Sequence, residues 1–245
     1  MPPDGEVTPV APVAGAERSL TAFERALTAG RQPTAVYGLG PAGLREAAGL
    51  AAATGNTIGT TRDGDVVRRL RRGRCPVAVD PGVTERVERT LESDALRVVA
   101  NPAVVATQAA VHLVAVPAGV GAAAPEALTD TLRRLATGLD HGDLVCLTSP
   151  VRPGTCRDLV APLLTAESGL GPTEYGLAAT PRVRSADDAD PRRLVGSSDD
   201  RARRAGGRFF ACLTDERVSR LGDAQTAEQL AAYAALAGPA PVDPE

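Results

Sequence analysis

The sequence predicts an α/β protein: a Rossmann-type, doubly wound, mostly parallel sheet with helices on both faces. Short apolar segments alternate with helical segments of ten to sixteen residues, which is typical of βαβ units. Uninterrupted apolar strands such as "HLVAV" and "DLVCL" fit a sheet that is covered on both faces. A glycine-rich turn, "GLGPAG", follows the first predicted strand. The 245 residues can bury a core and allow one domain or two.

The first half of the chain supplies the first βαβ units. Residues 20–30 have helical apolar spacing and end on glycine, so they predict a helix. The run "TAVYG" predicts a buried strand, and the Ala-rich segment after it begins with proline and ends with glycine, as a helix does. The predicted elements after residue 30 are strand 34–38, helix 41–55, strand 56–61, helix 64–73, strand 95–100 and strand 110–119.

The second half continues the alternation and then becomes charged. Its predicted elements are helix 124–139, strand 143–150, helix 154–169 and strand 174–181. The turn-rich residues 185–207 predict a loop, a short strand at 192–196 and a helix, and 208–216 ("RFFACLTDE") predict a last strand. The predicted organisation is a disordered lead-in at 1–17, a dinucleotide-binding domain at 18–225, a terminal helix at 226–238 and a tail at 239–245.

Composition excludes several function classes. The net charge of −3 gives no reason to expect a nucleic-acid partner, and all 27 basic residues are Arg, so no Lys can act as a base or form a Schiff base. We expect no membrane span and no secretory signal, which makes the cytoplasm the default location. No cysteine pair or histidine has zinc-ligand spacing, so no metal site is predicted. The four cysteines are expected to be reduced and mostly buried: Cys75, Cys146, Cys156 and Cys212.

The turn "GLGPAG" matches G-x-G-x-x-G between a strand and a helix, the context in which that motif binds dinucleotides. Gly38 permits the tight turn, Gly40 lets a pyrophosphate approach the backbone, and Gly43 lets the helix pack closely on the strand. The helix N-terminus then supplies free N–H groups and a positive dipole end. The predicted phosphate-binding residues are Gly38, Leu39, Gly40, Pro41, Ala42 and Gly43.

The end of the second strand decides which cofactor fits. An Asp or Glu usually binds the adenosine ribose there, but this chain has Thr61 followed by Arg62. Arg62 can accept a 2′-phosphate, which would favour NADP, or it can simply point to solvent. NAD and NADP both remain open, and Asp63 is better explained as the N-cap of the following helix.

Several segments, in order, resemble the N-terminal domain of the UDP-glucose/GDP-mannose dehydrogenase family. "YGLGPAGL" resembles the family's G-L-G-Y-V-G-L, "RRGRCPVAVDPGV" its R-G-x-x-P…E-P-G-L, and "HLVAVPAG" its V-x-I-x-V-P-T-P. "GDLVCLTSPVRPGTCRDLVAPLL" resembles G-D-x-V-x-x-x-S-T-V-x-P-G-T, and "AATPRV" resembles Y-x-P-E-R. "TAEQLAAYAAL" is similar to the start of the helix that links the family's two domains. The resemblance covers roughly residues 33 to 236.

The resemblance implies both a cofactor site and a chemistry. These enzymes oxidise a sugar C6 alcohol twice with NAD, through a cysteine thiolate in their C-terminal half. It places Val116, Pro117 and Ala118 beside the middle of the cofactor and Ser149 towards the nicotinamide. It also makes helix 226–238 a candidate contact with a second copy or a partner chain, marked by an exposed apolar face between Leu230 and Leu236.

The sequence departs from the family where the chemistry would lie. Pro150 replaces a threonine of S-T-V, Arg182 replaces the glutamate of P-E-R, and the chain ends before the family's cysteine motif and sugar-binding domain. Three interpretations follow. The first is an NAD(P)-binding domain protein without autonomous catalysis. The second is an active NAD-dependent UDP-sugar dehydrogenase that works with a separate catalytic partner chain. The third is a structural or interaction domain with a decayed cofactor site.

Overall fold

The computed structural model describes residues 11–13, 17–118, 126–185, 188–214 and 216–237. Its strands are β1 (Thr34–Tyr37), β2 (Thr57–Thr60), β3 (Leu96–Val98), β4 (Val111–Val114), β5 (Leu144–Leu147), β6 (Gly176–Ala179), β7 (Arg182–Ser185), β8 (Asp188–Gly196) and β9 (Arg217–Leu221). Its helices are α1 (Glu17–Thr28), α2 (Pro41–Thr54), α3 (Gly64–Leu70), α4 (Pro81–Glu92), α5 (Pro102–Ala106), α6 (Glu126–Ala136), η1 (Cys156–Val160), α7 (Ala161–Ser168), α8 (Asp200–Leu213) and α9 (Ala224–Ala237).

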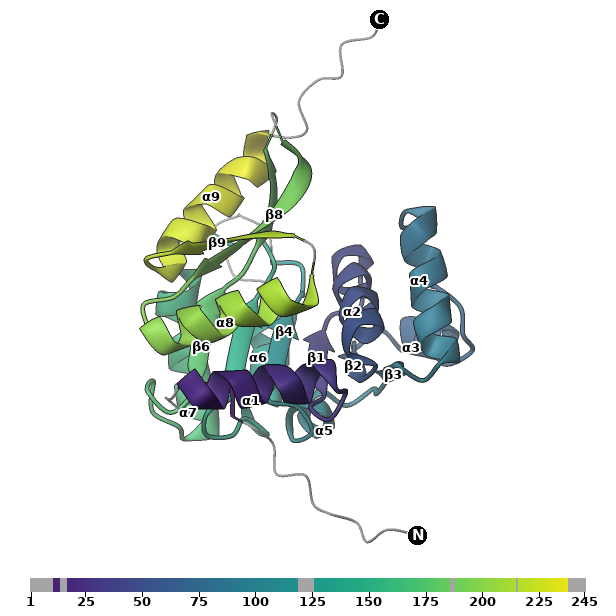
Figure 1. Cartoon of the computed structure of the whole chain (residues 1–245), viewed down its shortest axis with the longest axis horizontal. Helices are drawn as coiled ribbons and strands as arrows, with labels where there is room; N and C mark the ends of the chain where they lie inside the picture. The colour runs from purple at the N-terminus through teal and green to yellow at the C-terminus, as the bar shows by residue number, and fades with distance from the viewer. Residues whose placement is uncertain (1–10, 14–16, 119–125, 186–187, 215, 238–245) are drawn as a thin grey trace, which may run out of the picture.

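The strands form one sheet in the order β3-β2-β1-β4-β5-β6-β8-β7, and β9 pairs with β8 (Figure 1). Strands β1 to β6 are parallel to one another, which is the strand order 3-2-1 and 4-5-6 of a Rossmann sheet. β8 runs antiparallel to β6 and β7, and β9 runs parallel to β8. The predicted fold class is therefore confirmed, with an added mixed edge.

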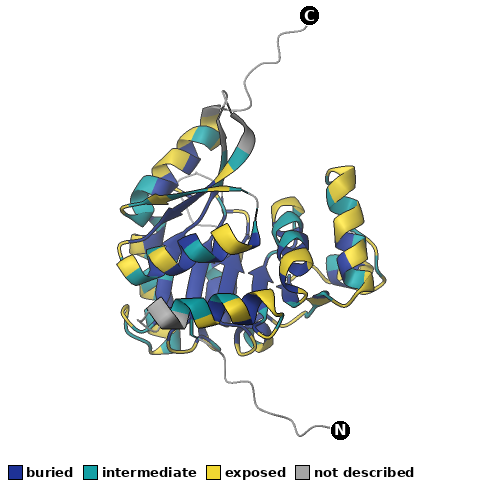
Figure 2. Ribbon diagram, in the orientation of Figure 1, coloured by how far each residue is buried: buried dark blue, intermediate teal, exposed yellow. Residues whose placement is uncertain are grey.

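Two apolar clusters cover the two faces of this sheet. Phe23 of α1, Leu44 of α2 and Phe209 of α8 belong to one cluster. Val105 of α5 and Leu132 of α6 belong to the other, together with α7 and the inner face of α9. Every residue of β4 and β5 is buried, and Figure 2 shows the central strands as buried ribbons between helices with mixed exposure. The uninterrupted apolar strands of the sequence are thus the covered centre of the sheet.

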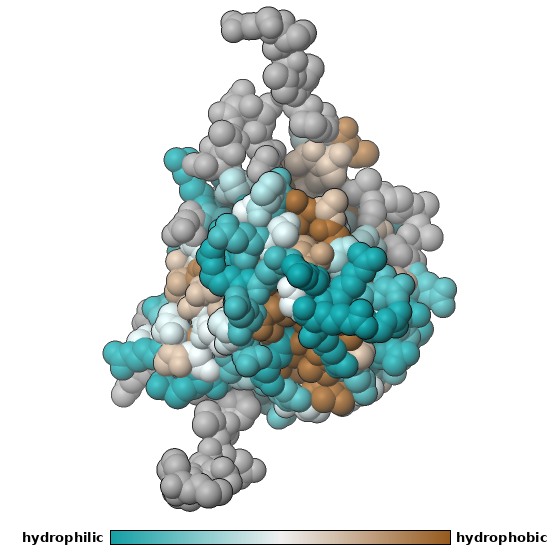
Figure 3. All heavy atoms as spheres, turned by 90° about the vertical axis from the view of Figure 1, so that its right-hand side faces the viewer, coloured by the Kyte–Doolittle hydropathy of each residue, from teal (hydrophilic) through white to brown (hydrophobic). Residues whose placement is uncertain are grey.

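The outer surface differs from this core. Seen from the side that carries α4 in Figure 1, the surface is mostly hydrophilic and is crossed by a strip of apolar residues (Figure 3). In the described part of the chain, no helix is long and apolar enough to cross a membrane.

Local signals in the sequence explain where several helices begin. The Asp63 carboxylate accepts hydrogen bonds from the N–H groups of Asp65 (2.9 Å) and Val66 (3.1 Å), so the predicted N-cap of α3 is confirmed. Asp199 caps α8 in the same way through the Arg201 N–H at 2.9 Å. The predicted helix at 154–169 is split into η1 and α7, because Pro162 has no N–H group for a continuous α-helical ladder.

The prediction of a last strand at 208–216 is wrong. Residues up to Leu213 form the second half of α8, and the last strand is β9, which follows it. The aromatic pair suggested a strand, but Ala202, Ala205, Phe209 and Leu213 recur at helical spacing and are all buried. The sequence pattern also predicts no element at α4, α5, β7 or β9.

Part of the predicted lead-in at 1–17 lies outside the described residues. Within it, Val13 is buried and its N–H donates to the Gly142 carbonyl at 3.0 Å, and α1 already begins at Glu17. The tail at 239–245 also lies outside the described residues. The boundaries of the domain at 18–225 remain predictions.

A buried arginine connects the mixed edge of the sheet to helix α2. Arg193 of β8 is 1% exposed, and its guanidinium lies 2.6 Å from Glu46 Oε1 on α2 and 3.1 Å from Glu216 Oε2. It also donates to the Thr180 carbonyl and lies over the Phe210 ring, 4.5 Å from the centroid. Burial opposes its charge, but the two carboxylates outweigh that effect and hold the pKa of Arg193 above its usual range.

Replacing Arg193 by Ala should destabilise the protein by about 3–5 kcal/mol, because the partly buried Glu46 carboxylate would lose its counter-charge and Glu216 would keep only its pair with Arg182. Urea unfolding followed by circular dichroism measures this loss. Arg204→Ala is the matched control, since Arg204 makes an exposed pair with Asp200 and its loss should cost less than about 1 kcal/mol. Equal effects of the two substitutions would contradict the central role of Arg193.

Candidate functional site

The glycine turn lies at the carboxyl end of β1, where the strand order reverses. β2 lies on one side of β1 and β4 on the other, and the connections of the two sets of strands leave in opposite directions. In open parallel sheets this point forms a crevice that holds ligands. The motif therefore sits where a Rossmann sheet would place a nucleotide.

The first and third glycines are required by the backbone itself. Gly38 has φ +92°, in the left-handed region, and a Cβ there would lie 2.9 Å from the Ala115 carbonyl oxygen. A Cβ on Gly43 would lie only 1.7 Å from the Gly38 carbonyl oxygen and 3.4 Å from the Ala115 Cβ. The steric roles predicted for these two glycines, a tight turn and close packing of helix on strand, are confirmed.

The second glycine has no such steric need. Gly40 is the N-cap of α2, with φ −73°, and a Cβ there would meet nothing within 4 Å. No side chain caps α2, its first turn has no acidic residue, and Pro41 stands at its start. Within the described residues, the first N–H groups of α2 therefore lack a capping side chain, beside open space. That arrangement is a ready site for an anion.

A pocket of about 190 Å³ opens at this turn. Seven predicted residues line it: Gly38, Leu39, Gly40, Thr61, Arg62, Val116 and Pro117. The structure adds five that the sequence analysis missed: Tyr37, Thr60, Pro102, Ala127 and Thr131. The pocket is thus built from the ends of β1, β2 and β4 and closed by α5 and α6.

Five predicted residues do not line this pocket. Pro41 and Ala42 are exposed in the first turn of α2, and Gly43 is buried beneath the turn. Ala118 is buried directly before residues 119–125, which lie outside the described part of the chain. Ser149 Oγ donates to the Val116 carbonyl at 2.6 Å, which ties the loop after β5 to the loop after β4.

The end of β2 carries two threonines and an arginine, and Asp63, which follows them, is used to cap α3. Thr60 is buried, and its Oγ1 has no hydrogen-bond partner within the described residues. Thr61 Oγ1 accepts the Asp63 N–H at 3.4 Å, and the Asp63 carboxylate caps α3. The Arg62 guanidinium lies 3.1 Å from Asp130 Oδ2 on α6, so Arg62 has a specific partner rather than only solvent.

The cysteines do not offer a reactive thiolate near this crevice. Burial raises the pKa of Cys146 to about 12. Burial and the neighbouring Glu228 carboxylate raise the pKa of the Cys156 thiol well above its usual range. Cys212 lies on α8, where burial raises the pKa of its thiol to about 11. In the described residues, no group of three His, Cys, Asp or Glu side chains could hold a metal ion.

Glu228 is a buried acid that the sequence analysis did not single out. It lies on α9, is 1% exposed, and accepts the N–H groups of Gly154 (2.6 Å) and Cys156 (2.8 Å). It therefore caps the start of η1, in the loop that also carries Ser149. A lone acid among the alanines of α9 was the available signal for it.

Neither of the two substituted positions lines the pocket at the glycine turn. Arg182 Nε lies 2.5 Å from Glu216 Oε1, so the reversed charge at this position is neutralised by a carboxylate from the loop before β9. Arg182 lines a separate groove of about 900 Å³ together with Arg45, Asp80 and Arg217. Pro150 is exposed after β5.

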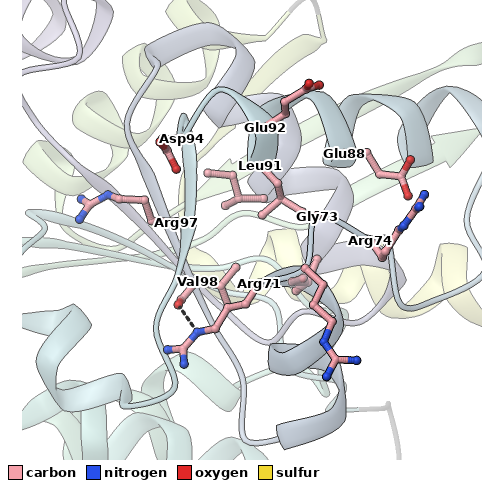
Figure 4. Close-up of a pocket in the computed structure, with 12 residues that line it drawn as sticks. Arg71, Gly73, Arg74, Glu88, Leu91, Glu92, Asp94, Arg97 and Val98 are labelled. Carbon is pink, nitrogen blue, oxygen red and sulfur yellow. Dashed lines mark hydrogen bonds between the residues drawn. The ribbon is translucent and has the colours of Figure 1, made fainter.

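A further hollow of about 590 Å³ lies at the outer edge of the sheet (Figure 4). Its rim carries arginines from the end of α3 and from β3, and acids from α4 and the residues after it. Arg71 Nε donates to the Val98 carbonyl at 3.2 Å, which closes the end of β3. Because β2 separates β3 from β1, this hollow is not part of the crevice at the glycine turn.

Comparison of the sequence with known protein families identifies the family of this chain. Residues 32–212 match the model of the UDP-glucose/GDP-mannose dehydrogenase family, NAD binding domain. The chain belongs to this family. Its place in the family confirms the resemblance inferred from the ordered motifs and supports NAD as the cofactor of the domain. A comparison with curated proteins finds no match.

Solved structures agree with the fold. UDP-D-ManNAc dehydrogenase from Pyrococcus horikoshii superposes with a TM-score of 0.72 at 24% identity, over 82% of this chain and 49% of that one. GDP-mannose dehydrogenase from Pseudomonas aeruginosa gives a TM-score of 0.72 at 19% identity, over 83% and 49%. UDP-glucose dehydrogenase from Pyrobaculum islandicum gives 0.69 at 24% identity, over 81% and 48%. The chain therefore spans about half the length of each of these structures.

The glycines make a paired prediction about stability. Gly43→Ala should destabilise the protein by at least about 3 kcal/mol, because its Cβ overlaps the Gly38 carbonyl. Gly40→Ala should change stability by less than about 1 kcal/mol, because its Cβ enters open space. Thermal unfolding of both variants checks this, and equal losses would mean that Gly40 also serves packing.

Proposed function

We propose that this chain binds a nicotinamide dinucleotide in the crevice at the glycine turn and does not oxidise a nucleotide sugar by itself. One observation carries the proposal: Gly40 leaves open space at the uncapped N-terminus of α2, inside a pocket at the reversal of strand order. The fold gives no other reason for the missing side chain, whereas a pyrophosphate would require it.

The lining residues fit the parts of such a cofactor. The pyrophosphate belongs over Gly38 and Gly40, where the first turn of α2 presents its N–H groups. The adenosine ribose belongs beside Thr61 and Arg62, which line the same pocket as Thr60. Val116, Pro117 and Ala118 would flank the middle of the cofactor, and Ser149 would approach the nicotinamide, which accepts hydride when bound.

Loss of autonomous catalysis is supported by the residues at the substituted positions. Pro150 has no hydroxyl, and Arg182 cannot act as a carboxylate base and is paired with Glu216. The buried thiols of Cys146 and Cys156 resist ionisation, which disfavours a covalent intermediate on either. Because catalytic groups act together, these changes favour binding without turnover.

A reducing compartment fits the cysteines. Cys75, Cys146, Cys156 and Cys212 are all unpaired thiols. Free thiols are typical of proteins kept in reducing surroundings, and disulfides of proteins in oxidising ones. This supports the cytoplasm as the location.

Calorimetric titration with NAD, NADP and their reduced forms tests the cofactor site. The folded wild type should bind at least one of them at micromolar to low millimolar affinity. Gly40→Asp should abolish binding, because its carboxylate enters the pyrophosphate space with like charge, while circular dichroism shows an unchanged fold. Unchanged affinity in this variant would remove the proposed site. Absence of heat with all four compounds would favour a structural domain with a decayed site.

A second candidate function, pairing with another polypeptide, is favoured by α9. Leu230, Tyr233 and Leu236 are 46%, 74% and 74% exposed and follow one another at three-residue spacing on one side of the helix. Large exposed apolar side chains aligned in this way mark interaction surfaces. We propose that this stripe binds a second copy of the chain or a partner chain, such as a separate catalytic subunit.

Charge placed on the stripe should disrupt that pairing. The double substitution Tyr233→Glu with Leu236→Glu should convert an associated species to monomer in analytical ultracentrifugation, because the charges would be buried in the interface. Ala211→Glu, on the exposed side of α8, is the control and should leave association unchanged. If the wild type is monomeric at all accessible concentrations, self-association is excluded as the role of the stripe.

A further inference from the structure

We propose that Asp130, acting through Arg62, is the residue that makes this crevice prefer NAD over NADP. The inference rests on the proposed cofactor function and goes one step further, because it names the group that discriminates at the adenosine end. Asp130 lies on α6, far in the sequence from the end of β2 where such a residue is normally found.

The position that normally distinguishes NAD from NADP carries an uncharged residue in this chain. Thr61 stands where an acid would meet the ribose hydroxyls, and its own hydroxyl accepts the Asp63 N–H. Asp63 cannot replace that acid, because its carboxylate is held by the Asp65 and Val66 N–H groups at the start of α3. Judged from β2 alone, the pocket would present a free arginine to a 2′-phosphate and favour NADP.

The Asp130 carboxylate on α6 opposes the preference for NADP that Arg62 alone would give. Ala127 and Thr131 of α6 line the pocket, and Asp130, on the same turn of that helix, pairs with the lining residue Arg62. Its Oδ2 lies 3.1 Å from the Arg62 guanidinium and 2.9 Å from Arg134 Nε. The hydrogen bond from Arg134, together with the nearby arginines, keeps the pKa of Asp130 below its usual range, so the group is charged at neutral pH.

The ion pair joins two segments that both contribute to the lining of the pocket. Arg62 belongs to the loop between β2 and α3, and Asp130 belongs to α6. A 2′-phosphate would compete with Asp130 for Arg62 and would meet a like charge at the same place. The uncharged 2′-hydroxyl of NAD meets no such repulsion and can donate a hydrogen bond to the carboxylate.

The test is calorimetric titration of wild type, Asp130→Asn, and Asp130→Asn combined with Arg62→Ala, each with NAD and with NADP. We expect the wild type to bind NAD more tightly. Asp130→Asn should raise affinity for NADP about tenfold and change that for NAD less than about threefold, since a freed arginine can then reach the phosphate. The double variant should lose the gain, which assigns it to Arg62.

Asp200→Asn is the matched control, because Asp200 also pairs with an arginine four residues later on the same helix, but on α8. It should leave both affinities unchanged. Equal wild-type affinity for the two cofactors, or an unchanged ratio in Asp130→Asn with NAD binding intact, would overturn the role of Asp130 and leave the cofactor site standing. If the folded wild type binds neither cofactor, the proposed function fails, and this inference fails with it.

Discussion

The packing of α2 against the Gly38 carbonyl is the contact on which the rest of the site depends. Without a side chain at Gly43, the helix begins directly on the turn, and its N-terminus is aimed along the crevice between β1 and β4. In the part of the chain that the structure describes, no side chain caps the first N–H groups of α2. A fold built for packing alone could have capped them with Ser or Asp at position 40. The uncapped start is therefore the feature that most needs a ligand to explain it.

The parallel part of the sheet could be predicted from the sequence because its signals are local. Apolar runs, helix-starting prolines and the glycine turn all lie within a few residues of the elements they specify. The C-terminal region was harder, since "RFFACL" fits a strand by residue type and a helix by spacing. Spacing prevailed, because Phe209, Phe210 and Leu213 reach the core together only from one helical face. Helix α4 has polar residues on most of its surface, which hid its short apolar face.

The site residues likewise fall into those that local sequence patterns predict and those that they do not. Seven of the residues that line the pocket were predicted because a local motif or an ordered resemblance marks them. Asp130, Glu228 and Arg193 could not be predicted, because each acts on a partner brought near only by the folded sheet. Nothing in the sequence separates Arg193, which is buried between two carboxylates, from the other arginines of the chain. Ion pairing across elements is set by topology, which local patterns do not encode.

A chain of hydrogen bonds connects helix α9 to the wall of the pocket. The inner side of α9 carries Glu228, which holds the Gly154 and Cys156 N–H groups at the start of η1. That loop carries Ser149, whose hydroxyl binds the Val116 carbonyl at the wall of the pocket. The exposed stripe of Leu230, Tyr233 and Leu236 lies on the same helix. A polypeptide bound there would contact the helix that holds these loops, so the two proposals, a cofactor site and a partner surface, are linked through Glu228.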